Sequence, residues 1–199
     1  MLQKTSRKTQ TRRPLKWKQT RFTEIGERED GSKWPWSEDA EHVCDFWHPC
    51  PFGAVGDRIW VRETWAEAGA GAPDLKLYRA NYPEHVPTHY ENVPPASDIR
   101  WTPSIHMPRW ASRITLEITG VRIERLNSIS QEDAQAEGME LTGWRPTYSD
   151  PDSGGEVWTP YDNFAQLWES IYGEESWKAN PWVWVIEFKV VPNVQDNPA

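Results

Sequence analysis

The clearest alternation of apolar and polar residues runs from Arg113 to Leu126. Ile114, Leu116 and Ile118 are apolar, and polar residues separate them. Successive side chains of a strand point to opposite faces, so this pattern predicts a long strand with one buried face. Gly120 interrupts the pattern, and the apolar positions resume after it with a shift of one residue, which is typical of a β-bulge.

Three further segments favour strands. Residues 58–65 follow a Gly-Asp turn and alternate with a period of two. Residues 75–79 form a shorter candidate, and residues 182–190 contain a run that is apolar on both faces. Bounded apolar runs of this length are typical of strands in a sheet.

Two segments have helical signals instead. Residues 131–137 follow Ser130, a preferred capping residue, and precede Gly138, which favours a helix end. Apolar residues over 164–171 recur at helical spacing before Gly173, which predicts an amphipathic helix.

The rest of the chain predicts loops. Residues 23–57 are interrupted by glycine and proline, and two loop insertions are expected at about 66–110 and 140–160. Because the strands and helices do not alternate regularly, the predicted fold class is α+β, a single domain over 1–199 with a small mixed β-barrel.

Composition narrows the class of protein. The 199 residues include 14 tryptophans and 17 prolines, which argues against both a disordered chain and a helical bundle. No apolar run approaches the roughly 20 residues that cross a bilayer, and no apolar segment follows the basic N-terminus. Two cysteines make no disulfide framework. We therefore expect a cytoplasmic protein without a membrane partner.

Charge is distributed unevenly along the chain. The formal net charge is −8, yet residues 1–21 contain eight basic residues and no acidic one. A basic segment on an acidic chain indicates a local anion site. The alternative is a solvated terminal tail.

Several segments resemble the ASCH family, which has a PUA-like β-barrel fold. Residues 7–13 resemble the family signature G-x-K-x-x-E-x-R, with Ser6 at its glycine and Thr11 at its glutamate. Residues 55–61, 113–139 and 185–189 resemble its later elements in family order. Only seven residues precede Lys8, where family members usually have a strand and a helix. Residues 106–113 further resemble ASCH-like proteins of bacteriophages and prophages, so a bacterial, phage-encoded protein is expected.

With threonine at this position, the segment resembles the ASCH proteins that hydrolyse N4-acetylcytidine, which have the pattern K-x-x-T and a glutamate at the end of the helix after the long strand. This resemblance implies that Lys8 is a base, Thr11 the nucleophile and Glu137 the proton donor, with no cofactor or metal. A threonine hydroxyl needs an adjacent base, and lysine acts as one only when burial or nearby positive charge favours its neutral form. The expected substrate is a modified nucleoside or single-stranded RNA.

Two alternatives remain. The chain is either a binding module for RNA or a modified nucleotide, without turnover, or a ribonuclease that uses His106 or His42. For binding, arginines suit phosphate and exposed tryptophans suit unpaired bases. The candidate substrate-binding residues are Arg7, Arg12, Arg13, Glu63, Arg109, Trp110 and Arg113.

Two further groups of residues are candidates for an ion pair and for a metal site. Glu63 has the parity of apolar Ile59 and Val61, so we expect it to be buried beside Arg113, Arg58 or the Lys8 site. His42, Cys44, His48 and Cys50 have residue types that suit zinc, but their spacing matches no usual zinc motif, so a loop with partly buried thiols is favoured.

Overall fold

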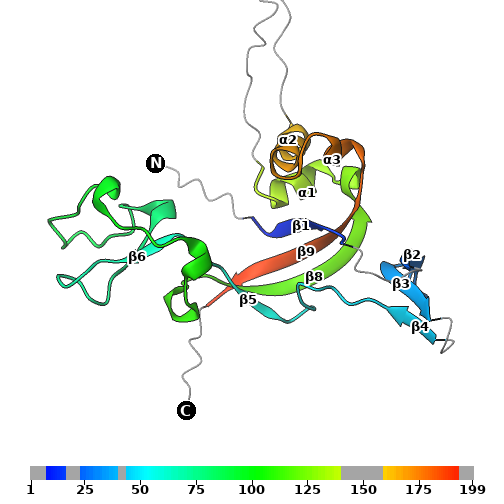
Figure 1. The fold of residues 1–199 in the computed structure, drawn as a ribbon, viewed down its shortest axis with the longest axis horizontal. Coiled ribbons are helices and arrows are strands. Elements are labelled where there is room, and N and C mark those ends of the chain that lie inside the picture. Colours follow the sequence, from blue (N-terminus) through cyan, green and yellow to red (C-terminus); the bar gives the residue numbers. More distant parts are fainter. Residues whose placement is uncertain (1–7, 17–22, 40–43, 140–158, 193–199) are drawn as a thin grey trace, which may run out of the picture. The chain divides into compact units, whose positions relative to one another are not determined.

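The computed structural model describes residues 8–16, 23–39, 44–139 and 159–192 (Figure 1). The chain divides into two compact units. One comprises residues up to Asp57 together with Ile118–Lys189, and the other comprises Arg58–Glu117 with the chain from Val190 onward. The described residues contain no helix with the length and apolar character needed to cross a bilayer.

A curved four-stranded sheet has the strand order β1-β9-β8-β5 (Figure 1). Its strands are β1 (Gln10–Pro14), β5 (Arg58–Trp60), β8 (Thr115–Arg125) and β9 (Trp182–Val191). β1 is antiparallel to β9, with Gln10 opposite Glu187 and Pro14 opposite Val183. β5 is antiparallel to the first part of β8. The predicted strands over 113–126 and 182–190 are confirmed, whereas the predicted strand 58–65 is shorter.

Helices cover one face of this sheet in the first unit. They are α1 (Gln131–Ala136), α2 (Pro160–Tyr172) and α3 (Glu175–Lys178), and a 3₁₀ turn, η5 (Leu126–Ser128), precedes α1. The Ser130 side chain caps α1 and Thr159 forms a capping box with Asp162 at the start of α2. Gly173, with φ of 94°, ends α2 in a conformation that favours glycine. Both predicted helices are confirmed.

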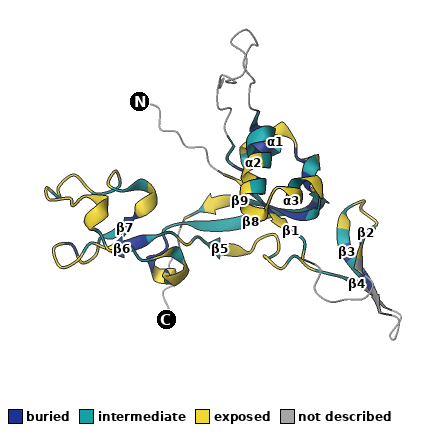
Figure 2. Ribbon diagram, turned by 45° about the horizontal axis from the view of Figure 1, so that its top comes forward, coloured by how far each residue is buried: buried dark blue, intermediate teal, exposed yellow. Residues whose placement is uncertain are grey.

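The core lies between these helices and the sheet (Figure 2). Val183 and Val185 of β9 contribute from the sheet, and Phe164 and Trp168 contribute from α2. Successive β9 residues are buried on both faces, as the apolar run predicts.

The prediction that residues 23–57 form a loop is wrong. They contain a three-stranded antiparallel sheet, β2 (Thr23–Glu27), β3 (Lys33–Asp39) and β4 (Cys44–Trp47). Trp34 of β3 contacts Trp184 of β9 edge-on, with ring centroids 5.4 Å apart. This contact places Trp34 against the sheet face opposite the helices, so β9 is covered on both faces near Trp184.

The second unit, taken by itself, is mostly irregular, as its proline content predicts. It contains the hairpin β6 (Trp65–Glu67) and β7 (Lys76–Tyr78). Four 3₁₀ turns follow: η1 (Arg79–Asn81), η2 (Ala96–Asp98), η3 (Ser104–His106) and η4 (Arg109–Ala111). Its small core is formed by Trp65, Tyr78, Met107 and Ala111. Most of the predicted 140–160 insertion lies outside the described residues.

The packing of α2 gives a direct test of the core. Phe164 is 3% exposed, whereas Leu167 on the same helix is 38% exposed. We predict that Phe164→Ala lowers the free energy of unfolding by about 3–5 kcal/mol, because it removes buried area and leaves a cavity. Leu167→Ala is the matched control, with an expected loss of less than about 1 kcal/mol. Urea unfolding measures both, and equal losses would contradict this core assignment.

Candidate functional site

Backbone hydrogen bonds bring the start of the described chain to the end of α1. The Thr9 N–H donates to the carbonyl of Ala136 at 2.8 Å, and the Thr9 carbonyl accepts from Phe188 N–H at 2.8 Å. Gly138, with φ of 93°, terminates the helix just after Glu137. Lys8 therefore lies beside Glu137 although 128 residues separate them in the sequence.

Lys8 and Glu137 form an ion pair, with Lys8 Nζ 3.0 Å from Glu137 Oε2. The Glu137 side chain is 3% exposed and the Lys8 side chain is 45% exposed. The other carboxylate oxygen, Oε1, accepts a hydrogen bond from Arg12 Nη1 at 3.3 Å. Glu137 is thus a buried carboxylate held by a buried arginine on one side and contacted by an accessible amine on the other.

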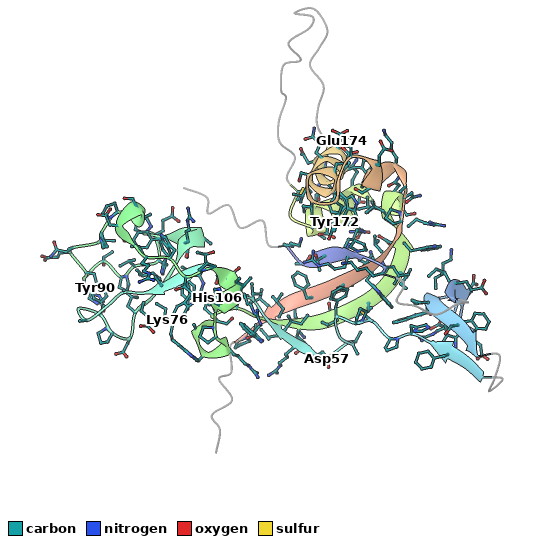
Figure 3. All side chains as sticks on the ribbon, in the orientation of Figure 1. Asp57, Lys76, Tyr90, His106, Tyr172 and Glu174 are labelled. Atoms are coloured by element: carbon teal, nitrogen blue, oxygen red, sulfur yellow. The ribbon has the colours of Figure 1, made fainter. Side chains whose placement is uncertain are left out.

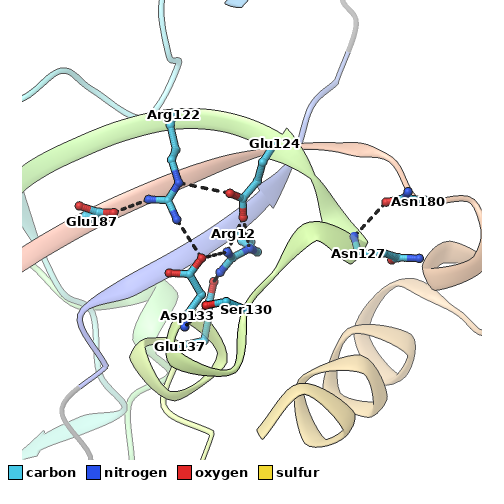
Figure 4. A network of polar contacts seen from close by, with 9 residues as sticks. All are labelled: Arg12, Arg122, Glu124, Asn127, Ser130, Asp133, Glu137, Asn180 and Glu187. Carbon is cyan, nitrogen blue, oxygen red and sulfur yellow. Dashed lines mark hydrogen bonds and ion pairs between the residues drawn. The ribbon is translucent and has the colours of Figure 1, made fainter. Parts of the chain in front are cut away.

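The Arg12 guanidinium is completely buried and contacts three carboxylates (Figure 4). Besides Glu137, it donates through Nε to Glu124 at 3.0 Å and through Nη2 to Asp133 at 2.9 Å. The planar guanidinium suits this role because its donors point in several fixed directions at once. Arg12 therefore ties β1 to β8 and to α1 through side-chain contacts alone.

Arg122 extends this network to β9 (Figure 4). It donates to Asp133 at 3.0 Å and to Glu124 at 3.2 Å, and it also contacts Glu187. Burial alone would lower the pKa of Arg122, but the carboxylates of Glu124, Asp133 and Glu187 outweigh burial and raise that pKa above its ordinary value. The two arginines share Glu124 and Asp133, so none of these carboxylates is buried without a cation.

The structure does not bring Thr11 to this cluster. Buried and less buried residues alternate along β1, with Gln10 and Arg12 buried on the helix-facing side. Thr11 has the opposite parity and lies across from Ile186, on the sheet face where Trp184 meets Trp34. The convergence predicted for three residues therefore holds for Lys8 and Glu137 but not for Thr11.

The arginines of the basic segment are separated in the same way. Arg13 is exposed and has the parity of Thr11, so it lies on the opposite face from Arg12. The buried Arg12 guanidinium pairs with the carboxylates of Glu124, Asp133 and Glu137, which makes it a structural cation and not the phosphate contact that the sequence suggested. Arg7 lies outside the described residues.

In the second unit, Glu63 pairs with Arg113, the partner expected for a structural role. Arg113 donates through Nε at 2.8 Å and through Nη2 at 2.7 Å, a two-bond fork. The hydrogen bonds that Arg113 donates to Glu63 raise the pKa of Arg113. The guanidinium also lies 4.0 Å from the centre of the Tyr78 ring, where burial raises the pKa of the tyrosine hydroxyl.

Trp110 and Arg109, also in the second unit, are exposed in η4. The Trp110 ring packs edge-on against Trp65, with centroids 5.4 Å apart, and Lys76 Nζ lies 5.3 Å from the ring centre. His106 is exposed in η3. Trp110 is thus a large exposed aromatic that packs against a buried ring and has a cation over one of its faces.

The described part of the zinc candidate is divided between a strand and a loop: Cys44 begins β4, and His48 and Cys50 follow that strand. His48 Nε2 lies 2.8 Å from the Ser37 hydroxyl, and burial raises the pKa of the Cys50 thiol. Within the described ranges, no three His, Cys, Asp or Glu side chains form a metal-binding group. His42 lies outside the described residues, as does the side chain of Cys44.

Sequence reasoning missed the charged residues around Arg12 and Arg122. Arg122 and Glu124 stand at alternate positions near the end of the predicted strand, where two opposite charges on one face of a strand are close enough to pair. Asp133 lies within the predicted helix 131–137, and Glu187 interrupts the apolar run of β9.

Comparison of the chain with known protein-family models, with curated proteins and with solved structures finds no match.

Removal of the Arg12 guanidinium tests the network. We predict that Arg12→Met costs about 3–5 kcal/mol of unfolding free energy, because the buried carboxylate of Glu137 loses its buried cation while Glu124 and Asp133 keep only Arg122. The neighbouring exposed arginine supplies the control, since Arg13→Met is expected to change stability by less than about 0.5 kcal/mol. Chemical denaturation of both variants provides the measurement, and a stable Arg12→Met variant would show that the network is dispensable.

Proposed function

We propose that this chain is an ASCH-type protein of the PUA-like fold that hydrolyses the amide of an N4-acylated cytosine nucleoside, using Lys8 and Glu137. One observation carries the proposal: the accessible amine of Lys8 lies 3.0 Å from the buried carboxylate of Glu137. The curved sheet, with a short helix following its long strand, is compatible with this family.

The geometry favours water over Thr11 as the nucleophile, because Thr11 occupies the other face of β1. Glu137 accepts one proton from water as the water oxygen bonds to the acyl carbon. The carbonyl π electrons move to the oxygen, and the Lys8 ammonium stabilises the resulting oxyanion. When the C–N bond breaks, Glu137 returns the proton to the departing N4 nitrogen. The products are the carboxylic acid and the free amino nucleoside.

Arg12 has a positioning role in this scheme. Its hydrogen bond to Oε1 fixes one carboxylate oxygen, so that Oε2 is the oxygen presented toward Lys8. Lys8, being half exposed, is the group that moves aside to admit water and substrate. A buried acid–base group beside an accessible cation is a common arrangement in hydrolytic sites.

Hydrolysis of N4-acetylcytidine tests these roles. We predict that Glu137→Gln and Lys8→Met each lower kcat/KM at least roughly 100-fold, since each removes a group that acts in the transition state. Thr11→Val is expected to stay within about threefold of the wild type, because the methyl replaces a hydroxyl on the opposite face. The products are quantified by chromatography, and circular dichroism checks that each variant is folded.

Two outcomes would overturn the proposal. If the wild-type protein leaves N4-acetylcytidine intact, the proposed hydrolase activity is ruled out. A Thr11→Val variant as inactive as Lys8→Met would instead restore threonine as the nucleophile and show that water is the wrong choice.

A second candidate function, binding of single-stranded RNA without turnover, is favoured by Trp110. This ring is 52% exposed and is backed by Trp65, with Lys76 nearby. An exposed aromatic ring that carries a cation over one face is suited to stacking on an unpaired base with its exposed surface.

Binding of a short single-stranded RNA distinguishes this candidate. We predict that Trp110→Ala weakens the affinity by roughly 5- to 150-fold, the usual contribution of one stacked base. Ile105→Ala is the control, because Ile105 is also exposed, at 69%, but offers no ring. Fluorescence anisotropy at several salt concentrations measures both variants, and equal affinities would argue against stacking on Trp110.

A further inference from the structure

The second unit contains an open cavity that the Lys8–Glu137 site does not use. Its volume is about 440 Å³, and its lining comes entirely from residues 68–94. This volume falls within the range of about 300–1,000 Å³ that is typical of small-molecule pockets. The unit therefore has room for a ligand of its own.

The lining combines aliphatic and aromatic side chains. Ala72, Leu75 and Leu77, near the β6–β7 turn, contribute the aliphatic part. Tyr82 and Tyr90 contribute aromatic rings (Tyr90 is labelled in Figure 3). Flat apolar groups of this kind favour a ligand with a planar ring, because such a ring stacks on aromatic faces and also covers aliphatic surface.

The aromatic rings are held in place before any ligand arrives. The Tyr82 hydroxyl donates to the Pro94 carbonyl, and the Tyr82 ring packs edge-on against Trp101 with centroids 5.6 Å apart. The rings of His89 and Tyr90 lie 4.3 Å apart at an interplanar angle of 37°. Rings fixed in this way lose little side-chain freedom on binding, which favours affinity.

The polar part of the lining restricts the charge of the ligand. His89, Glu91 and Asn92 line the cavity, whereas no lysine or arginine does. A carboxylate accepts hydrogen bonds from amino groups and ring N–H groups, and it repels an anion such as phosphate. The cavity thus disfavours an anionic ligand and suits one that donates hydrogen bonds.

An adjoining cavity of about 360 Å³ makes room for a larger ligand than a single ring. The two cavities share Tyr82, Val86, Tyr90, Val93 and Pro94. A ligand whose ring occupies the first cavity can extend a second group along these shared residues into the next.

We propose that these two cavities bind an unphosphorylated nucleoside whose base carries an amino group: guanosine, cytidine or adenosine. The base stacks on Tyr82 and Tyr90, and its amino group donates to Glu91. The sugar extends into the adjoining cavity. This site is separate from the proposed hydrolase residues and requires no turnover.

Gly71 gives a clean way to block the cavity. It lines the larger cavity, its backbone needs no positive φ, and a Cβ atom added there would meet nothing within 4 Å. Gly71→Trp therefore adds a bulky side chain at the lining of the cavity without a clash at its Cβ atom. Ala70→Trp is the matched control, because Ala70 is the exposed neighbour and does not line the cavity.

Isothermal titration calorimetry of the full chain with guanosine, cytidine and adenosine tests the proposal. We expect at least one nucleoside to bind, Gly71→Trp to weaken it at least tenfold, and Ala70→Trp to leave it unchanged. Glu91→Gln should reduce the preference for the nucleoside over its 5′-monophosphate, because it removes the repelling charge. Three results would each overturn the proposal. None of the three nucleosides binds, the Gly71→Trp variant binds as tightly as the wild type, or the wild type binds the monophosphates more tightly than the nucleosides.

Discussion

The buried guanidinium of Arg12 is the interaction on which the first unit depends. It is fully buried and contacts carboxylates from β8 and α1. A buried cation is costly unless each of its donors is satisfied, so the strand and the helix must reach their places together. The same requirement fixes Glu137, whose position beside Lys8 is the basis of the proposed hydrolase site.

The network also explains why only part of the basic segment belongs to the site. β1 places alternate residues on opposite faces, so Arg12 lies under the helices while Thr11 and Arg13 lie on the other side. Lys8 precedes the strand, and the backbone hydrogen bonds of Thr9 to Ala136 and Phe188 fix its position. Residues 8–13 therefore contribute a structural cation and an accessible amine, and a hydroxyl that is turned away from both.

Much of the α+β fold could be predicted from the sequence, because alternation over β8 and helical spacing over α2 are strong local signals. β3 could not, since Pro35 lies within the central strand of its small sheet, where proline is normally absent. β1 has no apolar residue to mark a buried face, because its burial rests on Arg12 and its ion pairs. The meeting of Lys8 with Glu137 was expected only from the family resemblance, since spacing along the chain carries no information about it.

A double-mutant cycle between Arg12→Met and Glu137→Gln measures most directly whether the buried arginine holds the site carboxylate. Unfolding free energies of the wild type, the two single variants and the double variant give the coupling between the two side chains. We expect a coupling of about 1–3 kcal/mol, because the side chains are in contact and buried. Additive losses, with a coupling below about 0.3 kcal/mol, would contradict the claim that Arg12 organises Glu137 and the site around it.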